Sequence, residues 1–246
     1  MDGECPLLSF KLHSWNALAP GLEDKAAWSE WLLNPVDLPE ILPKLPLKQI
    51  PPMLRRRLTE LGKCAVGAAL PLLEGVDAIP AVFASRHGDT PLTLSLLESI
   101  ADKEPMSPTG FSLAVHNSIG GLLSIARQDV SEITAIASMD ALIPHALLEA
   151  ATQLSNNNRV LCVVYDVPLP ELYQPYCISN SYPFAVAMVL SLDEGDSVLL
   201  DSSLTGLAPN TQNNDALQLM RFLCGFENQV QFSSGQHGSA WRISRR

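Results

Sequence analysis

The residues that could perform chemistry in this chain are few and widely separated. Five histidines are spread from His13 to His237 with no pair one helical turn apart, and the five cysteines form no C-x-x-C pair. Metal sites and disulfide frameworks use closely spaced side chains, so the sequence predicts neither. It also contains no G-x-S-x-G nucleophile turn and no glycine-rich phosphate loop. We therefore expect no bound cofactor.

One short motif does carry reactive side chains. Arg86-His87-Gly88 follows an apolar run at residues 78–84 that predicts a buried strand. The triplet resembles the motif of histidine phosphatases, in which the histidine attacks phosphorus and the arginine holds the phosphoryl oxygens. Such a site needs further arginines, and none occurs between Gly88 and Ser124. The alternative is structural: Gly88 permits a tight turn and His87 orders the loop.

The composition predicts a globular, acidic protein. Of the 246 residues 47% are hydrophobic, and the formal net charge is −10. No segment combines the basic density and aromatic residues of a nucleic-acid surface, so binding to DNA or RNA is not expected. No basic segment followed by an apolar one marks a signal peptide, and no apolar run reaches the roughly 20 residues of a membrane span. We expect a cytoplasmic protein.

Strands and helices are predicted to alternate through the middle of the chain. Apolar runs predict strands at residues 78–84, 132–137, 159–165, 184–192 and 197–200, and helical spacing predicts helices at 92–101, 111–126 and 142–154. Such alternation indicates an α/β protein with helices covering the sheet. The first fifty residues read as irregular apart from a short helix at 26–33, and a further helix is predicted at 53–73. Possible strands at 229–233 and 240–243 have no predicted role.

Four features in order resemble a known family. Ser107-Pro108 begins a helix that carries Asn117, then Gly120, then Ser124-Ile125; a strand, a sharp turn and a long helix follow, and Pro183 opens an apolar strand. This order is similar to that of β-ketoacyl synthases. The resemblance implies a thiolase-like fold truncated to about the family's N-terminal half. We predict one domain, 1–246, with an N-terminal segment (1–52), an α/β core (53–200) and a C-terminal extension (201–246).

The resemblance also implies that the condensing chemistry is missing. The family's cysteine nucleophile should fall at Ala137, Ser138 or Met139, and none of these is a cysteine. A thiol is required because the N-terminus of the helix stabilises the thiolate that accepts the acyl chain. Ser138 would need an adjacent base, and the sequence shows none, since His145 is expected inside the helix. The family's two active-site histidines belong to the half that this chain lacks.

Chain-length-factor subunits keep this scaffold without the cysteine and form heterodimers with an active β-ketoacyl-ACP synthase. The chain resembles the short chain-length-factor-like proteins of bacterial aryl polyene clusters. The resemblance implies a non-catalytic partner that shapes the acyl-chain tunnel of the synthase and meets the acyl carrier protein only indirectly. Residues 120–137 would then face the partner, and the candidate interface or tunnel residues are His116, Asn117, Gly120, Ser124, Met139 and Leu142.

Other interpretations remain open at this point. The candidate interface residues could be ordinary core side chains. The chain could be a stand-alone enzyme, either a phosphatase that uses Arg86 and His87 or an acyl hydrolase that uses Ser138. It could also be a structural protein without a synthase partner.

Overall fold

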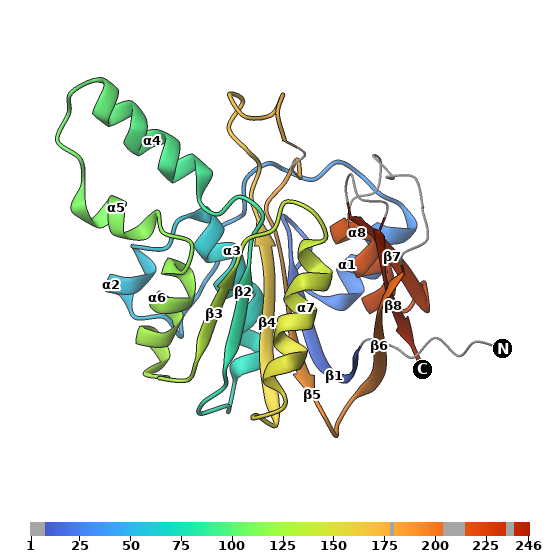
Figure 1. The fold of residues 1–246 in the computed structure, drawn as a ribbon. Coiled ribbons are helices and arrows are strands. Elements are labelled where there is room, and N and C mark those ends of the chain that lie inside the picture. The colour runs from blue at the N-terminus through green and yellow to red at the C-terminus, as the bar shows by residue number, and fades with distance from the viewer. Residues whose placement is uncertain (1–7, 178–179, 204–214, 235–238) are drawn as a thin grey trace.

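The computed structural model describes residues 8–177, 180–203, 215–234 and 239–246. They form one eight-stranded mixed sheet in the order β3-β2-β4-β5-β1-β6-β8-β7 with helices on both of its faces (Figure 1). The strands are β1 (Leu8–Leu18), β2 (Ala81–Ala84), β3 (Ile133–Ile136), β4 (Arg159–Asp166), β5 (Phe184–Ser191), β6 (Asp196–Ser203), β7 (Gln229–Ser234) and β8 (Ser239–Arg245). Helices are α1 (Lys25–Leu33), α2 (Pro52–Arg55), α3 (Glu60–Ala69), the 3-10 turn η1 (Leu70–Leu73), α4 (Thr90–Ala101), α5 (Pro108–Leu113), α6 (Ser118–Arg127), α7 (Leu142–Gln153) and α8 (Asp215–Leu223).

The two central strands explain the continuous apolar runs of the sequence. Every residue of β5 is buried, and six of the eight residues of β4 are. Alternate side chains point to opposite faces of a strand, so Cys162 and Val164 join one core while Val163 and Tyr165 join the other. A strand that is covered on both faces has no polar side, which is why its sequence does not alternate.

Each face of the sheet has its own set of helices. Buried residues of α1, α7 and α8 pack in the first core, and buried residues of α3, η1 and α6 pack in the second. The C-terminal strands and α8 enclose the first core beside α7, where the ring of His145 lies edge-on to the ring of Trp241 at 5.5 Å between centroids. The C-terminal extension therefore covers α7, a role that the sequence did not predict.

Strand direction determines where a site can form. β2 pairs in parallel with both β3 and β4, whereas the other pairings in the sheet are antiparallel. Parallel strands end at the same edge of the sheet, so the loops after β2, β3 and β4 meet there. The first two loops contain the Arg86-His87-Gly88 motif and the segment 137–141, and β4 ends at the same edge with Asp166.

Most of the predicted elements are confirmed, including the two C-terminal strands, but three predictions were wrong. Residues 8–18, which were expected to be irregular, form β1, a central strand between β5 and β6. The helix predicted at 53–73 divides into α2, α3 and η1, because Thr59 caps α3 by accepting from the amide of Gly62. The helix predicted at 111–126 divides into α5 and α6 at residues 114–117.

Among the described residues, no helix is long and apolar enough to cross a membrane. No group of three or more described histidine, cysteine, aspartate or glutamate side chains could hold a metal ion.

Candidate functional site at the start of α7

Helix α7 starts at the edge of the sheet where the parallel strands end. Its N-cap is Ala141, whose φ of 52° lies in the left-handed region that non-glycine residues rarely adopt. The expected nucleophile window, Ala137 to Met139, therefore occupies the connection from β3, and the sharp turn itself falls two residues later. Residues 137–141 contain no cysteine.

The cysteines of the core cannot supply the missing thiolate. Cys64 and Cys162 are fully buried. Burial raises the pKa of the Cys162 thiol to about 12 and also raises the pKa of the Cys64 thiol. Both side chains therefore remain protonated and act as small apolar residues.

The connection before α7 does hold one reactive pair. The Ser138 Oγ lies 3.1 Å from Nδ1 of His145 and donates to the carbonyl oxygen of Asp140 at 2.6 Å. The expectation that Ser138 has no adjacent base was wrong. Residues seven apart meet because the chain turns back at Ala141, which brings the loop against the first turn of the helix.

The loop after β2 is held by carboxylates. The Asp166 carboxylate accepts from the Ser85 hydroxyl at 2.8 Å and from the Arg86 amide at 3.0 Å, and the Arg86 guanidinium lies 3.8 Å from the Asp215 carboxylate. Burial raises the pKa of Asp166, against the opposing effects of the Ser85 hydrogen bond and the Arg86 charge. Burial likewise raises the pKa of Asp215, and Arg86 again opposes the shift.

This charge distribution argues against the phosphatase interpretation. A phosphoryl group carries negative charge and is bound by cations and N–H donors. The guanidinium of Arg86 instead lies beside Asp215, and the backbone amide of Arg86 donates to Asp166. A phosphate brought to Arg86 and His87 would have two carboxylates as neighbours.

His116, in the connection between α5 and α6, packs against the loop after β2. Its Nε2 lies 2.7 Å from the carbonyl oxygen of Ile136, at the end of β3. Gly88 has a φ of +61°, and a β-carbon there would lie 3.0 Å from His116 Nδ1. His116 therefore links the end of β3 to the loop after β2. Position 88 of that loop favours glycine, because φ is positive and a β-carbon would crowd His116.

The six candidate interface residues differ in exposure. Gly120 is buried against Phe83 and Ile133, and Leu142 is buried in the first core. Ser124 is half-buried and donates to the Asp129 carbonyl oxygen, and His116 is half-buried too. Of the six, Asn117 and Met139 are exposed.

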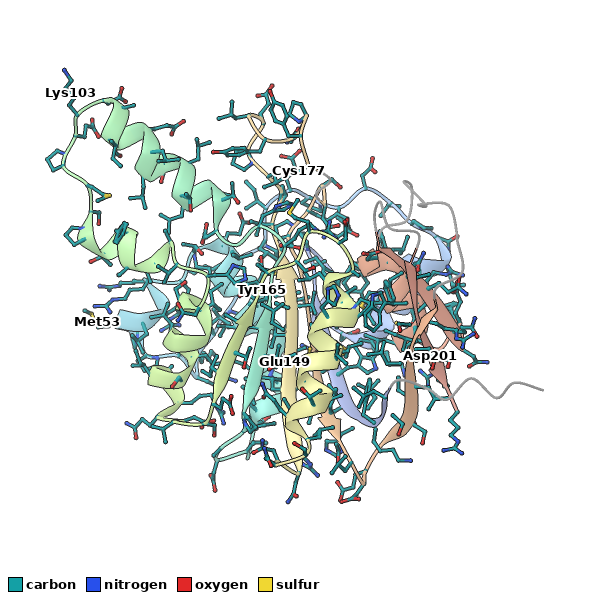
Figure 2. The ribbon with its side chains drawn as sticks, in the orientation of Figure 1. Met53, Lys103, Glu149, Tyr165, Cys177 and Asp201 are labelled. Atoms are coloured by element: carbon teal, nitrogen blue, oxygen red, sulfur yellow. The ribbon has the colours of Figure 1, made fainter. Side chains whose placement is uncertain are left out.

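A further group of exposed apolar side chains lies on two helices next to each other in the chain, and the sequence analysis missed it. We define the arm as residues 90–113, which contain α4 and α5. It projects away from the sheet, with Lys103 at its tip (Figures 1 and 2). No residue of α4 or α5 is buried, although α4 contains four leucines and an isoleucine. Leu97, Ile100 and Phe111 are 51%, 54% and 58% exposed. The sequence did contain a signal for this surface, because the residues of α4 are as apolar as those of the buried helix α7.

The fold and the start of α7 together define a class of protein. An α/β sheet whose buried helix starts at the edge shared by three parallel strands has the thiolase-like architecture, and the segment before that helix lacks the cysteine of a condensing enzyme. A family model, the N-terminal domain of β-ketoacyl synthases, matches residues 28–242. The chain belongs to this family.

Solved structures agree with that assignment. A chain in the complex of the ketosynthase ApeO with its chain length factor ApeC from Xenorhabdus doucetiae is 27% identical, with a TM-score of 0.83; the match covers 97% of this chain and 100% of that one. A chain in the AntDE:AntF complex of a type II polyketide ketosynthase with its acyl carrier protein is 14% identical, with a TM-score of 0.66, and 97% and 99% of the two chains are covered.

A β-ketoacyl synthase from Burkholderia phymatum is 10% identical, with a TM-score of 0.61 over 89% of this chain and 71% of that one. These two more distant matches support the fold alone. A search of curated proteins gives no significant match.

Proposed function

We propose that this chain is a non-catalytic subunit of the chain-length-factor type, which pairs with an active β-ketoacyl-ACP synthase in aryl polyene or related polyketide or fatty-acid-like biosynthesis. The near-complete, two-way coverage between this chain and a chain of the ApeO–ApeC complex supports the pairing. In this proposal residues 1–246 act as a single domain. The acyl carrier protein contacts the synthase, and this chain only indirectly.

The arm is the observation that carries the proposal. An amphipathic helix in a soluble protein normally buries its apolar stripe, and α4 buries no residue in this chain. Exposed side chains continue from the arm to Val115 and Ile125, which are 48% and 62% exposed. An apolar surface of this kind marks a site of protein association.

The edge of the sheet near α6 is also open to a partner. Within the described part of the chain β3 pairs only with β2, and its four residues are all half-buried. An edge strand with unpaired backbone groups can accept a strand of another chain. The proposed interface therefore comprises the arm, α6 and β3, which overlaps with most of the expected segment 120–137 and extends beyond it.

The condensing step would fall to the partner. Residues 137–141 contain no thiol and the thiols of Cys64 and Cys162 are buried, so none of these groups presents a thiolate at the start of α7 to accept an acyl group. Met139 is 54% exposed beside α7 and is the candidate that could reach an acyl chain in the partner. Leu142 is buried, so we assign it to the core.

Size-exclusion chromatography with light scattering tests the pairing. The chain is measured alone and after co-expression with a β-ketoacyl synthase from its own gene cluster. A stable one-to-one complex, with higher synthase solubility or activity than the synthase alone, is the expected result. A well-behaved monomer that does not associate with the synthase would favour the structural-protein interpretation instead.

A further inference from the structure

Ser138 and His145 meet the geometric criterion for a nucleophile and its base. The two side chains are within hydrogen-bond distance, at 3.1 Å between Oγ and Nδ1. Ser138 is half-buried and lies between the exposed residues Ala137 and Met139, so a substrate can approach its hydroxyl from solvent.

The surroundings orient both groups. The indole ring of Trp241 lies edge-on to the imidazole of His145, at an interplanar angle of 80°, and so restricts rotation of that ring. α7 is 12 residues long, and no side chain caps its N-terminus. In the first turn Pro144 has no N–H and the His145 amide donates to the Ala141 carbonyl oxygen, so the amides of Leu142 and Ile143 are the ones that can stabilise negative charge developing beside Ser138.

We propose that this pair, in a subunit that catalyses no condensation, gives the chain an activity of its own, the slow hydrolysis of activated acyl esters or thioesters. The substrate class follows from the chemistry, because a serine paired with a histidine attacks an acyl carbon. This activity goes beyond the proposed role as a synthase partner and does not depend on it.

The reaction balances with water as the only co-reactant. The Ser138 oxygen forms a bond to the acyl carbon while its proton moves to Nδ1 of His145, and the alcohol or thiol leaves with that proton. Water then attacks the acyl-serine, again giving a proton to His145, which returns it to Ser138 as the carboxylic acid is released. No oxidant, metal or cofactor is consumed.

The hydrogen bond to Asp140 explains why the reaction is slow. A hydroxyl has one proton to donate, and the carbonyl oxygen of Asp140, at 2.6 Å, is closer than Nδ1 of His145. The resting hydroxyl points toward that carbonyl oxygen, so it must rotate to His145 before attack. The histidine thus assists only a fraction of encounters.

The test uses the full-length chain and two probes. The first is p-nitrophenyl butyrate, whose hydrolysis is followed by absorbance. The second is a fluorophosphonate, which forms a covalent adduct with an activated serine and is located by peptide mass spectrometry. We expect hydrolysis above the buffer rate and an adduct on Ser138.

Three variants complete the test. General-base assistance contributes on the order of 10²-fold or more, so Ser138→Ala and His145→Gln should lose at least that factor in hydrolysis, or fall to the buffer rate. The adduct at Ser138 should also disappear in His145→Gln. Ser155→Ala, at an exposed serine beyond the other end of α7, is the matched control and should behave as wild type.

Two results would overturn the proposal. One is the absence of an adduct on Ser138 in a wild-type chain that hydrolyses the ester no faster than Ser138→Ala. The other is full hydrolysis in Ser138→Ala. Thermal unfolding of each variant shows whether a lost activity reflects lost structure. The adduct is measured on the wild-type chain, so it tests the proposal even where a variant does not fold. Pairing with a synthase is measured separately and does not affect either result.

Discussion

Replacing three exposed apolar side chains of the arm, Leu97→Ala, Ile100→Ala and Phe111→Ala, should weaken the complex with the synthase strongly. Complete burial of such a side chain contributes about 1.5–3 kcal/mol, and each is a little more than half exposed. Covering the exposed half therefore contributes about 1 kcal/mol per residue. The triple variant should lose about 3 kcal/mol of binding free energy, on the order of a 100-fold increase in Kd.

Isothermal titration of the chain with the separately purified synthase measures that change. The isolated variant should unfold at the wild-type temperature, because exposed side chains contribute little to the stability of the monomer. A matched control replaces Leu33, Val36 and Leu192 by alanine; these residues are 66%, 66% and 51% exposed and lie outside the arm. If both triple variants bind as wild type does, the arm is not the interface.

Three further predictions concern the loops and helices around the site. Gly88→Ala should lower stability by about 1–2 kcal/mol, because φ is positive and the new methyl group would meet His116; thermal unfolding measures it. Gly120→Ala should destabilise the protein by about 1–3 kcal/mol, since the new β-carbon would lie 2.8 Å from a methyl group of Ile133. Gly121→Ala meets nothing within 4 Å and should gain up to about 1 kcal/mol of helix stability. Equal effects of the two variants would contradict the packing of α6 against β3. The pKa of Asp166 is raised in the folded chain, so the folded chain keeps a proton that the unfolded chain releases. The free energy of unfolding should therefore fall as the pH rises from about 4 through the folded pKa. Denaturant titrations at several pH values measure this fall, and the Asp166→Asn variant should lack the contribution of Asp166 to it.

The sequence predicted the centre of the fold because its signals there are local. The apolar runs of β4 and β5 have no polar side, and their lengths suit strands. β1 gave no such signal, since Lys11, His13 and Ser14 interrupt it and its register with β5 shifts between Leu12 and Ser14. Pairing with strands on both sides makes that segment a strand, and such pairing is not encoded locally.

The site was predicted only in part for a similar reason. The missing cysteine can be read directly from residues 137–141. The contact of Ser138 with His145 depends on the positive φ of Ala141, and alanine carries no sequence signal for that conformation. The arm could have been recognised, because the sequence of α4 is apolar enough for a core while the structure gives it no core to enter.

The position of β1 has a consequence for how the chain is made. β1 (Leu8–Leu18) pairs with β5 (Phe184–Ser191) and β6 (Asp196–Ser203), so more than 160 residues are synthesised after β1 before its neighbouring strands exist. At 5–20 residues per second that wait lasts roughly 10–30 s. During this time a strand that is paired on both sides in the folded protein lies unpaired in the nascent chain, and unpaired strands are prone to aggregate. Soluble yield should therefore depend on translation rate and chaperone supply.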